Sequence, residues 1–298
     1  MIKVENITKR FGEHLVLDDI SATFERGKTN LIIGQSGSGK TVLTKVCIGL
    51  FEPDRGTVTF DDRPFSNTKE KHKADIRKEM GVLFQGGALF DSMNVEENVM
   101  FPLNMFTNMS YEEKIERVNF CLNRVNLNGI NKLSTSELSG GMMKRVAIAR
   151  AISNSPKYLF CDEPNSGLDP YTSILIDRLI SDLTKEFNMT TVVNTHDMNS
   201  ILEIGDKIGF IYQGQMLWQG DKNTILKTEC KELRDFVCAN TLARNIKGQF
   251  KYANRLNAKY TVVIGENELA EGVAAVKDMD KQEQTNVKFE DLYEVLSK

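Results

Sequence analysis

The chain has 298 residues, 41% of them hydrophobic and 27% charged, which is an ordinary globular composition. It can hold one large domain with a small appendage, and it is neither collagen-like nor wholly disordered. With 38 Lys and Arg against 41 Asp and Glu, the formal net charge is −3. This balance argues against a protein that coats nucleic acid or acidic membrane by bulk charge.

No segment has the pattern of a targeting or membrane-spanning sequence. The start, MIKVENITKRFG, lacks an apolar signal core, and no run approaches the roughly 18–20 apolar residues that cross a bilayer. The five cysteines form no CxxC pair and no zinc-like cluster with histidine, which indicates reduced thiols. We expect a cytoplasmic protein that reaches a membrane only through a partner.

The amino-terminal elements lead to a glycine-rich loop. Roughly alternating apolar patches in residues 1–30 predict short strands joined by turns. Residues 29–33, TNLII, have the pattern of a strand buried on both faces, and residues 42–50 that of a helix. The loop between them places backbone N–H groups at a helix amino terminus, where they can hold an anion.

This loop fits the spacing G-x-x-x-x-G-K-[ST], which is typical of a nucleoside triphosphate site. Its residues are Gly34, Gln35, Ser36, Gly37, Ser38, Gly39, Lys40 and Thr41. The glycines let N–H groups turn toward one centre and cradle phosphate oxygens. Lys40 supplies a charge to the outer phosphates, and Thr41 offers a hydroxyl to Mg²⁺.

The later elements alternate between helices and strands. We expect helices over 110–127, 139–155 and 221–243, strands over 158–161 and 191–194, and a hairpin within 206–220. This alternation predicts a largely parallel α/β sheet, in which ligands bind at the carboxyl ends of the strands.

Polar residues at two of these positions extend the predicted site. Asp162 and Glu163 follow the apolar strand YLFC, where Asp162 can hold the Mg²⁺ shell and Glu163 can act as general base on water. Ser139, Gly140 and Gly141 leave the start of a helix uncluttered, which suits a γ-phosphate.

Together these motifs resemble an ABC-type ATPase over residues 1 to about 240. Their order is the phosphate loop, Gln85, LSGGM, LFCDEP, NSGLD and VVNTHD. The resemblance implies an α/β P-loop NTPase with a RecA-like core, an antiparallel β subdomain, and a helical subdomain at about residues 90–155. Met142 stands where many relatives have glutamine. We expect this difference to bear on the ABC subtype and not on the ability to hydrolyse ATP.

The resemblance also implies roles for single residues. Phe11 would stack on adenine, Gln85 would sense Mg²⁺ and contact the permease, and His196 would contact the γ-phosphate beside catalytic Lys40 and Glu163. The implied nucleotide-binding residues also include Val42, and the metal ligands are Thr41, Gln85 and Asp162. The residues implied to couple two active sites are Ser166, Gly167, Leu168 and Asp169.

The implied assembly is a head-to-tail homodimer that sandwiches two ATP molecules and drives a separate permease. The stretch Gly86–Leu103 and LSGGM resemble the ATPases of Mla/MCE-type phospholipid transporters. This implies a subunit that lies on the cytoplasmic face of the inner membrane, with an MCE-type lipid-binding protein as a further candidate partner. A generic permease-facing segment, and hence another substrate class, is the alternative.

Residues 244–298 form a separate, charge-neutral tail. They resemble the last part of the anticodon-binding domain of histidyl-tRNA synthetase, with a helix, a strand at Tyr260–Ile264, a short helix, a hairpin and a last helix. The catalytic region of a synthetase is missing, so we expect a small α/β extension without aminoacylation or direct nucleic acid binding.

Two other function classes use the same phosphate loop. A soluble ABC ATPase acting on ribosomes or nucleic acid usually has two ABC units or a long coiled coil, and this chain has neither. LSGGM and the dimer-coupling loop argue against a small-molecule kinase.

Overall fold

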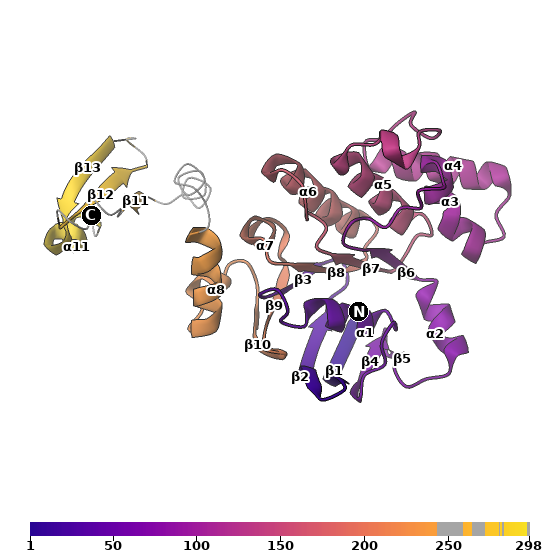
Figure 1. Cartoon of the computed structure of the whole chain (residues 1–298), viewed down its shortest axis with the longest axis horizontal. Helices are drawn as coiled ribbons and strands as arrows, with labels where there is room; N and C mark the ends of the chain where they lie inside the picture. The colour runs from indigo at the N-terminus through magenta and orange to yellow at the C-terminus, as the bar shows by residue number, and fades with distance from the viewer. Residues whose placement is uncertain (243–258, 264–271, 280, 282, 297–298) are drawn as a thin grey trace. The chain divides into compact units, whose positions relative to one another are not determined.

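A computed structural model describes residues 1–242, 259–263, 272–279, 281 and 283–296 (Figure 1). The chain divides into two compact units, Met1–Val237 and Cys238–Lys298. Cys47, Cys121, Cys161 and Cys230 are free thiols.

The first sheet of the larger unit is antiparallel, in the order β2-β1-β4-β5. Its strands are β1 (Ile2–Phe11), β2 (His14–Phe24), β4 (Arg55–Phe60) and β5 (Arg63–Pro64). The expectation of several short strands over residues 1–30 is wrong, because β1 and β2 are long and continuous. Their pairing shifts register at several points, and Asn6 and Asp19 have positive φ. Such irregularities interrupt the alternation of apolar residues that marks a strand.

The second sheet has six strands in the order β10-β9-β3-β8-β7-β6. Its strands are β3 (Thr29–Ile33), β6 (Met80–Leu83), β7 (Tyr158–Asp162), β8 (Thr190–Thr195), β9 (Lys207–Tyr212) and β10 (Gln215–Gly220). All pairs are parallel except the hairpin of β9 and β10. The predicted parallel sheet and closing hairpin are confirmed.

Eight α-helices belong to the described part of the chain before residue 243. They are α1 (Lys40–Cys47), α2 (Glu70–Arg77), α3 (Val95–Phe106), α4 (Tyr111–Arg124), α5 (Gly140–Ile152), α6 (Pro170–Glu186), α7 (Met198–Ile204) and α8 (Lys231–Leu242). The predicted capping box of Ser110 and Glu113 starts α4. Two 3₁₀ turns are η1 (Thr135–Glu137) and η2 (Ile225–Lys227).

Two predicted helices have different bounds. The helix expected over 42–50 begins at Lys40 and ends at Cys47. The helix expected over 221–243 begins only at Lys231. There the side chain of Asp221 accepts hydrogen bonds from the N–H groups of Asn223 and Thr224, which stabilises a turn instead of a helix.

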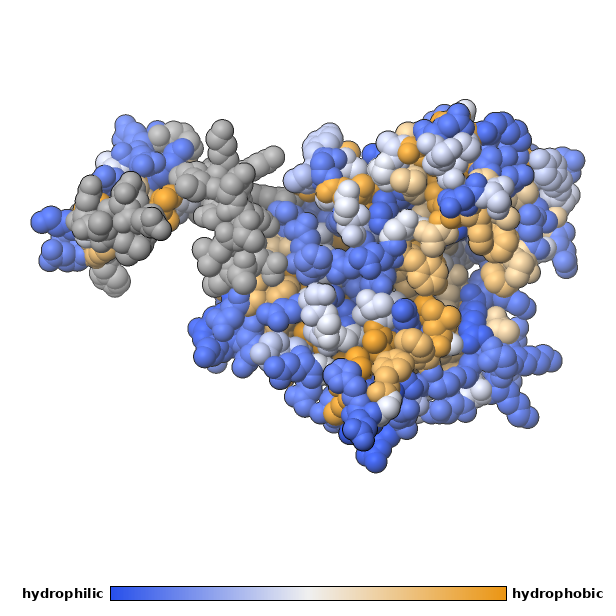
Figure 2. All heavy atoms as spheres, in the orientation of Figure 1, coloured by the Kyte–Doolittle hydropathy of each residue, from blue (hydrophilic) through white to orange (hydrophobic). Residues whose placement is uncertain are grey.

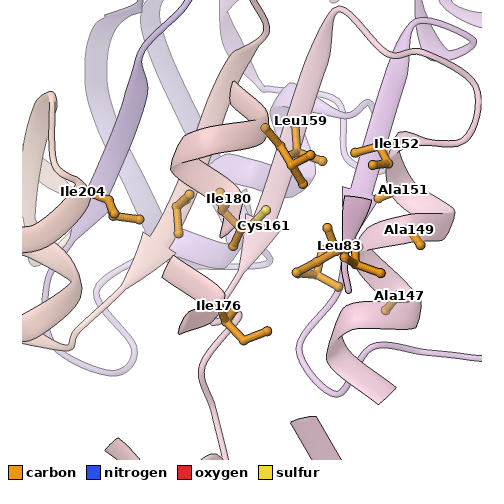
Figure 3. Packing of buried hydrophobic residues seen from close by; sticks show 14 of the residues in the cluster. Leu83, Ala147, Ala149, Ala151, Ile152, Leu159, Cys161, Ile176, Ile180 and Ile204 are labelled. Carbon is orange, nitrogen blue, oxygen red and sulfur yellow. The ribbon is translucent and has the colours of Figure 1, made fainter. Parts of the chain in front are cut away.

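The parallel sheet separates two hydrophobic cores. In one core, α1 and the antiparallel sheet pack against one face of the parallel sheet, through residues such as Leu43, Phe60 and Phe160. The other core packs side chains of α3–α7 against the opposite face. Figure 3 shows this second core, where Ala147 and Ile152 of α5 lie near Leu83 and Leu159 of the sheet. The two cores fix the strands whose carboxyl ends carry the predicted site.

The smaller unit contains an antiparallel sheet in the order β11-β12-β13. Its described elements are β11 (Tyr260–Val263), β12 (Val273–Asp278), β13 (Glu283–Lys288), η3 (Phe289–Asp291) and α11 (Leu292–Leu296). The strand predicted at Tyr260–Ile264, the hairpin and the last helix are present. The other two helices predicted for this tail lie outside the described residues.

Candidate nucleotide-binding site

The phosphate loop joins the fully buried strand β3 to helix α1. Gly34 has φ 151°, and a Cβ atom there would lie 2.2 Å from the carbonyl oxygen of Ile211. Gly39 has φ 110°, and a Cβ atom there would lie 2.8 Å from a methyl group of Leu17. Both positions therefore require glycine, for space and for backbone conformation. The loop's path is fixed by the strand and helix on which it packs.

The polar groups of this loop fit a phosphate. The Nζ of Lys40 donates to the carbonyl oxygens of Gly34 at 2.8 Å and Gln35 at 2.9 Å. Burial lowers the pKa of Lys40, while the charges of Glu163 and Asp162 act in the opposite direction. The buried hydroxyl of Ser38 has no hydrogen-bond partner within the described residues. An oxyanion would satisfy both groups, since it accepts from a hydroxyl and neutralises an ammonium.

Asp162 ends strand β7 and meets the first turn of α1. One of its oxygens accepts hydrogen bonds from the Thr41 hydroxyl at 3.2 Å and from the Asn194 amide at 2.9 Å. Asn194 also accepts from the Thr44 hydroxyl at 3.1 Å and is fully buried in β8. A carboxylate beside a threonine hydroxyl is an oxygen-rich pair that suits Mg²⁺.

The sequence prediction missed Asn194, although it orients the predicted metal-binding carboxylate. The sequence shows only that a polar amide ends the second predicted strand, 191–194, and does not show its contacts with Thr44 and Asp162. Buried polar side chains of this kind need fixed hydrogen-bond partners, and here the partners are the site itself.

Glu163 and His196 face each other above the neighbouring strands β7 and β8. Nδ1 of His196 lies 2.9 Å from Oε1 of Glu163. Glu163 has φ 47°, an uncommon conformation for a residue with a side chain, and its N–H donates to the carbonyl of Asn194 at 3.0 Å. The Glu163 side chain is mostly buried, while that of His196 is exposed. The pair thus combines a positioned carboxylate with a solvent-facing imidazole.

Two further predicted groups are Gln85, which follows β6, and the Ser139–Gly141 motif at the start of α5. Gln85 is exposed just beyond β6, the outer strand next to β7. Ser139 caps α5, and its hydroxyl accepts from the N–H of Met142 at 3.3 Å. No hydrogen bond within the described residues joins Ser139, Gly140 or Gly141 to the phosphate loop.

The loop of Ser166–Asp169 connects the site to α6. Asp169 caps this helix by accepting from the N–H groups of Tyr171 and Thr172 at 3.0 Å, and hydrogen bonding lowers its pKa. The N–H of Ser166 donates to the carbonyl of Glu163 at 3.1 Å. Gly167 has φ 81°, and Leu168 lies beside Gly140, where a Cβ atom would be 3.8 Å from it. The loop therefore runs from Glu163 to the start of α6 and passes beside the start of α5.

Phe11 and Val42 complete the predicted set. Phe11 ends β1 and is 43% exposed, which leaves ring surface for a ligand. Val42 lies in the first turn of α1 and is half-buried.

A family comparison agrees with this geometry. The model of the ABC transporter family matches residues 17–166, half of the chain. The chain belongs to the ABC transporter family.

Among solved ABC cassettes, the dimeric post-hydrolysis state of MJ0796 bound to ADP and Pi has a TM-score of 0.68 and 31% identity, covering 74% of this chain and 99% of that one. The cassette cbiO1 from Clostridium perfringens has a TM-score of 0.70 and 29% identity, covering 79% and 93%. The predicted fold class is confirmed.

Three ABC proteins that are similar to this chain are named for different substrates. The probable ribonucleotide transport ATP-binding protein mkl of Mycobacterium tuberculosis is 35% identical over 236 residues, which are 79% of this chain and 66% of mkl. The intermembrane phospholipid transport ATP-binding protein MlaF of Haemophilus influenzae is 34% identical, covering 80% and 90%. The methionine import protein MetN of Clostridioides difficile is 37% identical, covering 80% and 74%.

The tail matches a second family. The model of the anticodon binding domain matches residues 223–298, which confirms the predicted resemblance. In the part of the chain that the structure describes, no helix combines the length and apolar character needed to cross a membrane.

Proposed function

We propose that this chain is the ATP-hydrolysing subunit of an ABC transporter and drives a separate membrane permease. The observation that carries the proposal is the meeting of three motifs at one sheet edge. The phosphate loop, the pair Asp162–Glu163 and His196 follow the adjacent strands β3, β7 and β8. This is the edge at which α/β sheets bind ligands.

The proposed roles follow from the contacts. The loop amides, the Ser38 hydroxyl and Lys40 bind the phosphates of ATP. Thr41 and Asp162, with Gln85, would hold Mg²⁺. The positive charge of this ion would stabilise the negative charge of the phosphoryl group during its transfer. Glu163 accepts a proton from the attacking water, and His196 both orients Glu163 and contacts the γ-phosphate.

Within the described residues, the Ser139–Gly141 motif makes no hydrogen bond to the phosphate loop of its own chain. A second copy placed head to tail would bring this helix start to the γ-phosphate, with Ser166–Asp169 joining the two sites. In this arrangement ATP holds two subunits together, and loss of the γ-phosphate releases them.

An apolar groove of about 280 Å³ beside Gln85 is the proposed binding site for the permease. Phe84, which precedes Gln85, lines it together with Leu50 and Phe106, and all three side chains are exposed. Figure 2 shows apolar surface in this region, near α2 and α3. Exposed apolar surface of this kind favours a protein partner.

A phospholipid or related lipid is the proposed cargo, and the cytoplasmic face of the inner membrane is the proposed location. The similarity to MlaF supports this, as does the stretch Gly86–Leu103. An MCE-type lipid-binding protein would then be a further partner. The names of mkl and MetN define the competing cargoes.

One experiment tests the proposal. The full chain, reconstituted with its permease in phospholipid vesicles, is expected to hydrolyse ATP, and Lys40→Ala is expected to abolish this. Glu163→Gln should lose hydrolysis yet form a stable dimer at saturating Mg-ATP, as measured by light scattering, while the exposed control Glu116→Gln behaves as wild type.

The same assay distinguishes the cargoes. Hydrolysis should respond to phospholipid composition and not to added methionine or ribonucleotide. A monomeric Glu163→Gln protein, or hydrolysis unchanged in Lys40→Ala, would overturn the ATPase proposal. Co-purification with ribosomes or tRNA instead of a membrane protein would overturn the transport proposal.

A further inference from the structure

A second aromatic ring accompanies Phe11. The centroids of Phe11 and Phe51 lie 5.1 Å apart, with an angle of 74° between the ring planes. This edge-to-face geometry is favourable for an aromatic pair. Phe51 is partly exposed and packs against the core beneath the antiparallel sheet. The two rings come from distant points in the sequence, so their contact exists only in the folded chain.

The backbone around Phe51 is tied to both neighbouring elements. The N–H of Phe51 donates to the carbonyl of Lys45 in α1 at 3.2 Å. Three residues later, the N–H of Asp54 donates to the carbonyl of Thr8 in β1 at 2.9 Å. Phe51 thus lies in the segment between α1 and β4, which is hydrogen-bonded both to α1 and to β1, the strand that ends in Phe11.

The carboxylate of Asp54 strengthens this connection. It accepts a hydrogen bond from the backbone N–H of Arg10 at 2.5 Å and pairs with Nζ of Lys9 at 3.2 Å. The Arg10 N–H and the Lys9 charge hold the pKa of Asp54 below its usual range. The residues directly before Phe11 are therefore anchored to the loop that carries Phe51.

Two cations lie over the rings. Nζ of Lys9 is 5.4 Å from the centroid of Phe11, and Nζ of Lys45 is 5.6 Å from that of Phe51. Each contact restrains one ring further. Phe51 lies beside the last turn of α1, the helix that begins at the end of the phosphate loop.

We propose that Phe51 is a positioning residue for the nucleobase: it holds the Phe11 ring in the orientation that stacks on adenine. The inference rests on the proposed function and on the role that the family resemblance implies for Phe11, stacking on the base. Phe51 itself acts through Phe11. Its loss should therefore weaken recognition of the base and leave recognition of the phosphates intact.

Calorimetric binding of two ligands to the full chain tests this, namely ATP and inorganic tripolyphosphate, which has no base. Phe51→Leu keeps apolar bulk but removes the aromatic edge, and we expect ATP to bind about 3- to 10-fold more weakly. Tripolyphosphate should bind as in wild type, and Phe51→Tyr should restore ATP binding. Because Phe51 acts through Phe11, the double variant Phe11→Leu/Phe51→Leu should bind ATP no more weakly than Phe11→Leu alone.

Leu217→Ala, which replaces an exposed leucine of β10, serves as the control and should bind both ligands normally. Equal weakening of ATP and tripolyphosphate by Phe51→Leu would overturn the inference, because it would indicate general damage to the site. Unchanged ATP binding would overturn it as well. If the wild-type chain bound no ATP at all, the proposed function would fail instead, so the two failures are distinguishable.

Discussion

Lys144 is a buried lysine whose charge has no evident partner. It lies in α5 directly after the Ser139–Gly141 motif and is only 5% exposed. Its Nζ has no hydrogen-bond partner within the described residues, and burial lowers its pKa below the ordinary 10.5. An unpaired buried ammonium opposes folding, because it has lost its hydration without gaining a counter-charge.

Replacement of Lys144 by methionine should therefore stabilise the protein. We expect Lys144→Met to raise the free energy of unfolding at neutral pH by about 1–3 kcal/mol, since methionine fills a similar volume without charge. Because the folded-state pKa of Lys144 lies below its unfolded value, wild-type stability should rise as the pH increases through the folded pKa. The difference between the two proteins should shrink over the same range.

Urea unfolding at pH 7.5 and at pH 9.5 measures both effects. Exposed Lys71→Met is the matched control and should change stability little at either pH. Destabilisation by Lys144→Met at neutral pH would show that the ammonium has a stabilising partner.

At the level of single residues, the sequence indicated those candidate groups that belong to a contiguous motif. Lys40, Asp162 and Glu163 could be placed because each stands at the end of a recognisable strand or in a fixed spacing. Asn194 and Phe51 could not, because their roles come from contacts with residues far away in the sequence. A spacing pattern records which residues are neighbours along the chain and not which meet across the sheet.

At the level of elements, the apolar pattern predicted the parallel strands β3, β7 and β8, but neither β6 nor every helix. It indicated no helix for Val95–Phe106 or Pro170–Glu186. Pro102 inside α3 obscures the first, since proline normally ends a helix. The second had a usable signal, because Asp169 is an N-cap and Pro170 occupies the first turn.

Asn98 in α3 fixes the segment that follows Gln85. Its side chain is completely buried and makes four hydrogen bonds with the backbone between Phe90 and Asn94. The amide accepts from the N–H of Phe90 and donates to three carbonyl oxygens. One side chain thus replaces the regular hydrogen bonding that this irregular segment lacks.

Loss of this amide should be costly. We expect Asn98→Ala to lower the free energy of unfolding by roughly 2–3 kcal/mol, because buried backbone groups of the segment lose their partners. Guanidinium unfolding measures the change. The control is Asn123→Ala, which removes an exposed side-chain amide that donates to Asn128 and has no further hydrogen-bond partner in the part of the chain that the structure describes. It should change stability by less than about 0.5 kcal/mol. A similar effect of both variants would contradict the structural role of Asn98.

At the level of the whole molecule, the second family match begins before the first compact unit ends. The anticodon-type match begins at residue 223, yet the first compact unit extends to Val237. Leu233 and Phe236 of α8 are buried, and the ring centroids of Phe236 and Phe210 lie 5.4 Å apart. Through these residues α8 packs into the core of the ABC unit, so its first turns belong structurally to that unit. The first compact unit ends at Val237, inside α8, and the domain boundary at about residue 240 stays a prediction.

Two truncations separate these parts of the chain. Removal of residues 244–298 keeps α8, so the ATP hydrolysis rate with the permease should stay within about twofold of the full chain, equivalent to less than about 0.5 kcal/mol in activation free energy. Removal of residues 228–298 also deletes Leu233 and Phe236, and the loss of these buried side chains should lower the free energy of unfolding by about 2–5 kcal/mol or more. Hydrolysis assays and thermal unfolding of both proteins give the comparison. If the shorter deletion alone abolished hydrolysis, the tail would be part of the working ATPase, and the predicted domain boundary at about residue 240 would be wrong.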